Sequence, residues 1–74
     1  MPPLTEADLT EMFTYHAPTS AQQVHYESIR IAARAFANVL LAHTPPSADQ
    51  TAAIRLLRSC VATANAAVAL KGKY

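Results

Sequence analysis

Apolar side chains recur every three or four residues along two long stretches of the chain. The first stripe consists of Tyr26, Ile29, Ala33, Phe36 and Leu40, and the second of Ile54, Leu57, Val61, Ala64 and Val68. This spacing places side chains on one face of an α-helix. The pattern therefore predicts two helices that pack against each other through these faces as an antiparallel hairpin.

Prolines and the single glycine divide the chain at few places, which sets the expected bounds of each element. Residues 19–44 and 47–71 contain neither residue type, so both stretches are free of helix breakers. Thr5, Ser20 and Ser47 are each followed three residues later by Asp or Gln, the spacing of a capping box at a helix start. We expect one domain over residues 1–74, with a short helix at 5–13, a loop at 14–19, a long helix at 20–43, a proline turn at 44–47 and a long helix at 48–70.

Further apolar side chains lie off the two stripes, so each helix has more apolar circumference than one neighbour can cover. These residues are Ile31, Ala35, Val39, Leu41, Leu56, Cys60 and Ala67. A domain of this size buries only roughly 60% of its unfolded surface, and the lone Cys60 excludes a disulfide framework. We therefore expect an all-α chain that assembles into a compact homo-oligomer.

Charge is distributed unevenly, although the net charge is only +1. The acidic residues Glu6, Asp8, Glu11 and Glu27 precede every Lys and Arg, whereas six basic residues follow against Asp49 alone. Two interpretations stay open: solvated helix faces with pairing between subunits, or arginines that bind a compact anion.

Duplex nucleic acid and membranes are not expected as partners. Alanine and leucine dilute the basic residues, so these form no continuous basic stripe. No apolar run approaches the roughly 18 residues of a membrane span. Residues 1–11 lack the basic region and apolar stretch of a signal peptide, so we expect a soluble, intracellular protein.

The most informative segment is residues 13–19, which read Phe-Thr-Tyr-His-Ala-Pro-Thr. We expect Phe13 to pack under the hairpin as a hydrophobic staple. Tyr15 and His16 are amphipathic groups in a loop, and a tyrosine face is a stacking platform for a nucleobase. An aromatic loop near helical arginines therefore suggests a nucleotide ligand.

Together, several segments resemble a known family. They are residues 13–19, Gln23, residues 26–30, the turn at 45–47 and residues 64–68. Their order and spacing resemble the hairpin domain shared by phage anti-CBASS and anti-Thoeris sponge proteins, over about residues 12–69. Members of that family are compact helical oligomers, typically hexamers, that sequester cyclic oligonucleotides or cyclic ADP-ribose-type signals without cleaving them. The resemblance implies a phage counter-defence sponge in the cytoplasm of the infected bacterial host, which suppresses CBASS- or Thoeris-type immunity.

The resemblance also implies a ligand site. It places the base-stacking tyrosine at Tyr15 and the phosphate-pairing basic residue at Arg30. His16 and Thr19 flank the stacking position and are candidates for polar contacts with the ligand.

Two further candidates have alternative roles. Arg34 lies one turn after Arg30, so it serves the same phosphate, serves a second site, or is a surface or interface arginine. Asn65 lies in an apolar run, where it reads a base edge or forms a buried interhelical hydrogen bond.

The sequence offers little for catalysis or cofactors. His16, His25 and His43 are separated by nine and eighteen residues, so no pair has the i,i+4 spacing of a metal site. Gly72 is the only glycine, which excludes a glycine-rich phosphate loop. We therefore expect a protein that is not an enzyme, with no catalytic residue, no metal and no cofactor.

Two alternatives to a sponge remain. An all-helical oligomer can build an arginine-lined active site between subunits, as chorismate mutase-like enzymes do. A small helical regulator could instead bind a partner protein through the surplus apolar surface around Leu41 and Leu56. Tyr74 and the lysines near it are expected to form a frayed end.

Overall fold

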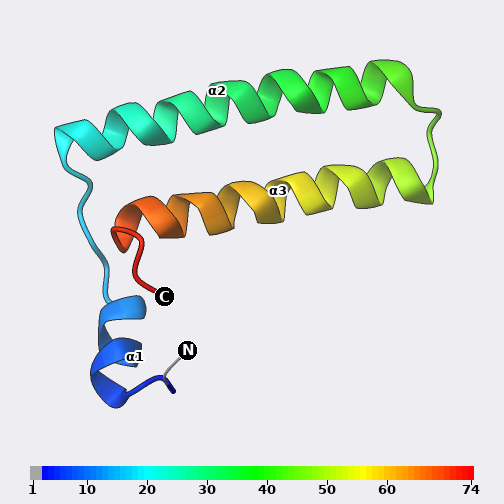
Figure 1. Cartoon of the computed structure of the whole chain (residues 1–74). Helices are drawn as coiled ribbons and strands as arrows, with labels where there is room; N and C mark the ends of the chain where they lie inside the picture. The colour runs from blue at the N-terminus through cyan, green and yellow to red at the C-terminus, as the bar shows by residue number, and fades with distance from the viewer. Residues whose placement is uncertain (1–2) are drawn as a thin grey trace.

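The fold is a helical hairpin with a short helix at its open end. A computed structural model describes residues 3–74, in which the helices are α1 (Glu6–Met12), α2 (Ser20–His43) and α3 (Ala48–Ala69). The long helices α2 and α3 run antiparallel, and α1 lies at their open end beside the C-terminus (Figure 1). Residues 3–74 contain no strand, which confirms the all-α prediction.

Thr19, the residue before α2, caps the start of that helix. The Thr19 hydroxyl accepts the Gln22 backbone N–H at 3.1 Å, and the Gln22 side chain accepts the Thr19 backbone N–H at 3.0 Å. The predicted pair of Ser20 with Gln23 was wrong by one residue, because Thr19 follows Pro18 in extended backbone and Ser20 is already helical. Such a reciprocal capping box satisfies two backbone donors that the helix itself cannot.

The turn between α2 and α3 is closed by a glutamine. The Ser47 hydroxyl accepts the Gln50 backbone N–H at 3.1 Å, as predicted. The Gln50 side chain, however, does not return to Ser47. Its amide donates to the carbonyl and the hydroxyl of Thr44, both at 3.1 Å, so it joins the end of α2 to the start of α3.

The seam between the long helices follows the predicted stripes with one exception. Every stripe residue of α3 and all but one of α2 are partly buried, but Phe36 is 53% exposed. Ala37 takes its place in the seam, since it lies four residues after Ala33 and so continues the same face. At the open end, the Gln22 amide donates to the Val68 carbonyl at 3.1 Å.

A single chain leaves unusually much surface uncovered. None of the described residues is fully buried, and the accessible surface is 5962 Å². A folded monomer of 8.0 kDa is expected to expose roughly 4,450 Å², so the excess is about 1,500 Å². The radius of gyration is 15.6 Å, against about 11 Å for a compact domain of this length.

The two ends of the described chain are joined by a polar clasp, by which we mean Asp8, Glu11, Lys73 and Tyr74. The Lys73 ammonium forms an ion pair with Glu11 at 3.0 Å. The Tyr74 hydroxyl lies 3.2 Å from carboxylate oxygens of both Asp8 and Glu11. The expectation of a frayed C-terminal end was therefore wrong.

Apolar contacts support this clasp. Met12 at the end of α1 lines a hollow that also includes Ala66, Ala67 and Leu70 near the end of α3. No Cα atom of α1 lies within 8 Å of a Cα atom of α2 or α3. The clasp and these side chains therefore hold α1 against the hairpin.

By length and composition alone, α3 is apolar enough to cross a membrane, contrary to the expectation that no stretch of the chain approaches a membrane span. Two features of α3 account for its composition without a bilayer. One face packs on α2, and Arg55 and Arg58 lie near its middle. Each arginine at the centre of a bilayer would cost about 2.5–3.5 kcal/mol.

Candidate functional site

The loop between α1 and α2 presents two aromatic rings to solvent. Phe13 and Tyr15 are each 84% exposed. The expected packing of Phe13 under the hairpin was wrong, because Phe13 is the C-cap of α1 and Met12 makes the contact with the hairpin instead. The Tyr15 ring face is open, as a stacking platform requires.

The side chains of His16 and Thr19, in the same loop as Tyr15, form hydrogen bonds with backbone groups. The His16 ring Nε2 donates to the Glu11 carbonyl at 2.7 Å. The Thr19 hydroxyl is the N-cap of α2. Both side chains therefore fix the loop that carries Tyr15, and the hydroxyl of Thr19 is already engaged within the chain.

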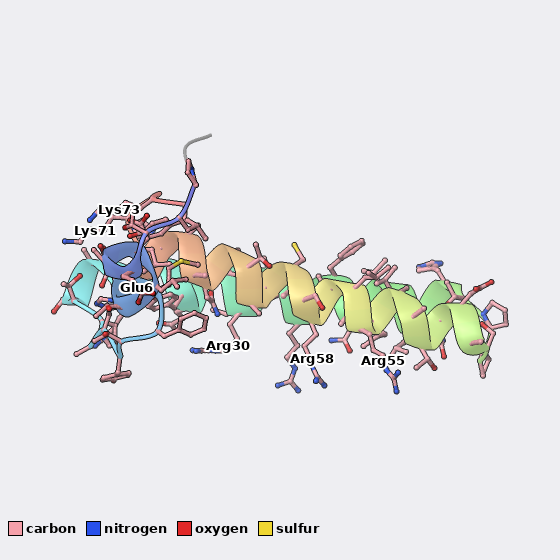
Figure 2. The ribbon with its side chains drawn as sticks, turned by 90° about the horizontal axis from the view of Figure 1, so that it is seen from below. Glu6, Arg30, Arg55, Arg58, Lys71 and Lys73 are labelled. Carbon is pink, nitrogen blue, oxygen red and sulfur yellow. The ribbon has the colours of Figure 1, made fainter. Side chains whose placement is uncertain are left out.

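The arginines of α2 have no partner among residues 3–74. Arg30 and Arg34 are exposed and take part in no ion pair or side-chain hydrogen bond of that range. In Figure 2, Arg30 of α2 projects to the same side of the hairpin as Arg55 and Arg58 of α3. This side of the hairpin therefore carries unpaired positive charge.

Asn65 is partly buried, and its Oδ1 atom is enclosed without a hydrogen-bond donor. The alternative of a buried interhelical hydrogen bond is thus wrong for this oxygen. A buried acceptor without a donor costs about 1–3 kcal/mol. Asn65 lies two helical turns after Arg58 and so points to nearly the same side of α3.

The structure does not bring Tyr15 and Arg30 into contact within one chain. Arg30 lies ten residues into α2, about 15 Å along the helix axis from its start. No hydrogen bond or ion pair of the described residues joins the loop at 14–19 to Arg30. One chain therefore supplies a stacking ring and a phosphate-pairing group at separate places.

The acidic end of the molecule is electrostatically coupled to the C-terminal tail. The Lys73 ammonium lowers the pKa of Glu11 below its ordinary 4.5. The hydrogen bond from the Thr5 backbone N–H lowers the pKa of Asp8 below 3.8. Desolvation, together with hydrogen bonds to the Glu11 and Asp8 carboxylates, raises the pKa of Tyr74 to about 12. The charges of Asp8, Glu11 and Lys73 are therefore paired within the chain, unlike those of the arginines.

Sequence reasoning missed two groups that matter for the site. It assigned no role to Arg58, although the helical register of the sequence already places it beside the seam. It also missed the clasp, since residues that are 62 positions apart, such as Glu11 and Lys73, leave no local pattern. No three His, Cys, Asp or Glu side chains of the described chain converge in a way that could hold a metal ion.

These features define a class of protein: a small all-helical hairpin with an exposed aromatic loop and unpaired arginines. Residues 6–69 match the Acb2/Tad1 hairpin domain. The chain therefore belongs to this family, the anti-CBASS and anti-Thoeris sponge family, whose members sequester ligands. No curated protein and no solved structure matches the chain.

Proposed function

We propose that this protein is a non-catalytic sponge that binds and sequesters cyclic nucleotide immune signals. The ligands are cyclic di- or trinucleotides and cyclic ADP-ribose isomers, and their capture suppresses CBASS- or Thoeris-type immunity in the cytoplasm of the infected host. The observation that carries the proposal is the family match over residues 6–69. It includes both Tyr15 and Arg30, which are exposed in the single chain.

In the proposed site, a base stacks on Tyr15 while Arg30 pairs with a phosphate. The guanidinium is a planar donor that suits phosphate oxygens. Because the two residues lie apart within one chain, we place the ligand at a boundary between subunits. The Oδ1 atom of Asn65, which has no donor within the chain, would accept a base amino group there.

We further propose that the chain assembles into a homo-oligomer, a hexamer by analogy with the family, and that the capture site lies between its subunits. About 1,500 Å² of surface beyond that of a normal monomer is uncovered in the single chain. Leu41 and Leu56 are among the exposed apolar side chains. Covering them with further copies would supply the missing core and would bring loops and arginines of neighbouring subunits together.

Calorimetry with a panel of cyclic dinucleotides, cyclic trinucleotides and cyclic ADP-ribose tests the proposal. A stacked base is worth about 1–3 kcal/mol, so Tyr15→Ala should weaken capture by about tenfold to a hundredfold. Phe13→Ala is the matched control, since Phe13 is as exposed as Tyr15 in the same loop. Arg30→Ala should weaken capture similarly, and Arg55→Ala, on the same side of the hairpin, should not.

The outcome also separates the sponge from its alternatives. Unchanged affinity in both Tyr15→Ala and Arg30→Ala would remove the proposed site. If neither wild-type protein nor variants bind any cyclic nucleotide, the exposed surface around Leu41 and Leu56 favours the protein-interaction module. A linear or hydrolysed product, recovered after the protein is denatured, would replace the sponge with an enzyme.

A further inference from the structure

The chain reverses its direction directly after α3. Lys71 and Gly72 both have a positive φ, of 57° and 76°. The Gly72 N–H donates to the Ala67 carbonyl at 2.9 Å, and the Lys71 N–H donates to the Val68 carbonyl at 3.3 Å, which is the pattern of a Schellman motif. The tail therefore leaves α3 in a defined direction, and the C-terminus lies beside α1 (Figure 1).

The tail binds both carboxylate oxygens of one residue of α1. Glu11 Oε1 pairs with the Lys73 ammonium at 3.0 Å, and Glu11 Oε2 lies 3.2 Å from the Tyr74 hydroxyl. A helix of seven residues is not stable alone in water, and no Cα atom of α1 lies within 8 Å of a Cα atom of α2 or α3. The position of α1 therefore depends on the clasp and on the contacts of Met12.

The same residue anchors the loop that carries Tyr15. The backbone carbonyl of Glu11 accepts the His16 ring Nε2 at 2.7 Å. The Thr14 hydroxyl donates to the Thr10 carbonyl, one residue earlier in α1. Both sequence neighbours of Tyr15 are thus bonded to the last turn of α1, whereas the N-cap of α2 is four residues away. The position of the Tyr15 ring therefore follows that of α1.

We propose that Lys73 and Tyr74 are positioning residues for the capture site: they hold Glu11, and through Glu11 they order the loop that presents Tyr15. This inference rests on the proposed function, since it takes Tyr15 as the residue that stacks on the ligand. A loop that samples several positions binds only in the fraction of molecules in which Tyr15 is in place, and the apparent affinity falls by that fraction. The tail thus sets the affinity of capture through the loop.

Hydrogen exchange of the ligand-free protein, measured by mass spectrometry, tests the first step without any ligand. In the Lys73→Gln/Tyr74→Phe double variant, the amides of residues 9–14 should exchange severalfold faster, and those of α2 and α3 should keep their wild-type rates. Lys71→Gln is the matched control, since Lys71 lies in the same tail and has no ion pair within residues 3–74. Wild-type rates at residues 9–14 in the double variant would overturn the proposal.

Calorimetry with cyclic di-AMP, cyclic tri-AMP and cyclic ADP-ribose tests the second step. Lys73→Gln and Tyr74→Phe should each weaken capture by about two- to fivefold, the range for an exposed ion pair or a single hydrogen bond, and the double variant by about tenfold. Lys73→Arg keeps the ion pair and should retain the affinity to within twofold. Unchanged affinity in the double variant would contradict the positioning role.

Glu11→Gln separates positioning from a general effect of charge. This variant keeps the backbone carbonyl that binds His16 but removes the charge that holds Lys73. A general charge effect would strengthen the capture of an anionic ligand, because a negative charge is lost. Positioning predicts the opposite, a loss of about two- to fivefold. Tighter capture in Glu11→Gln, or an equal loss in Lys71→Gln and Lys73→Gln, would therefore overturn the proposal.

A double-mutant cycle tests the route through His16. In a His16→Phe background, Lys73→Gln should weaken capture less than it does in the wild-type protein, because the link between Glu11 and the loop is already broken. An equal loss in both backgrounds would contradict this route. Light scattering should give the wild-type mass for Lys73→Gln and Tyr74→Phe, and a lower mass would overturn positioning in favour of a contact between subunits.

The two proposals can fail separately. If the wild-type protein captures none of the three probes, the capture proposal fails, and hydrogen exchange alone decides whether the tail orders the loop. If Tyr15→Ala loses capture while Glu11→Gln and the double variant of the tail retain it, the capture site stands and the positioning role is overturned. Loss in Tyr15→Ala together with a smaller loss in the tail variants supports both.

Discussion

The replacement of Leu56 by aspartate is the sharpest test of the assembly. Leu56 is 71% exposed in the single chain. Complete burial of a leucine side chain is worth about 1.5–3 kcal/mol, so association can still contribute about 1–2 kcal/mol at this position in each subunit. A carboxylate placed there adds a desolvation penalty of several kcal/mol. The expected result is a strong shift of the protein towards smaller species.

Light scattering over a range of protein concentrations measures this shift, and circular dichroism checks the helix content. Leu56→Asp should lower the mass before helix content is lost, and Leu56→Ala should have a smaller effect. Ser59→Asp is the matched control, since it adds the same charge to an exposed polar position of α3. A Leu56→Asp protein with the wild-type mass at micromolar concentration would refute the reasoning.

Three further outcomes are expected. Thr19→Ala should lower the free energy of unfolding by about 1 kcal/mol in thermal denaturation, and Ser20→Ala, inside the helix, should not; the reverse order would refute the assigned cap. Asn65→Leu should raise the melting temperature of the ligand-free chain, since it removes a buried oxygen without a donor, and should weaken ligand capture; a lower melting temperature would show that Oδ1 has a donor in the assembly. Because Lys73 lowers the pKa of Glu11 below 4.5, the stability from this ion pair should be present above pH 4.5 and lost as the pH falls through the lowered pKa, which chemical shifts of the C-terminal amides would follow; shifts that do not change with acid would contradict this.

Local patterns in the sequence were enough to predict the all-helical hairpin. Helix breakers, threonine and serine caps, and a three-to-four residue spacing all act over a few residues. Phe36 shows the limit of this approach. In an alanine-rich helix a small residue such as Ala37 can occupy the seam, so the largest apolar side chain is not a reliable guide to the buried face.

The candidate site was less accessible to sequence reasoning, because its parts are far apart in the chain. Tyr15 and Arg30 could be named from a motif, but the single chain holds them at separate places. The clasp at Tyr74 and the position of Arg30 on the same side as Arg55 and Arg58 depend on the antiparallel packing of the whole chain. The order of residues along the sequence does not show either of them.

Native mass spectrometry with a cyclic oligonucleotide tests the central claim most directly, because one spectrum reports both assembly and ligand. We predict a hexamer of 8.0 kDa chains that carries the intact cyclic ligand, and a Tyr15→Ala hexamer that carries none under the same conditions. A monomer without ligand, or an oligomer that releases a linearised product, would contradict the account.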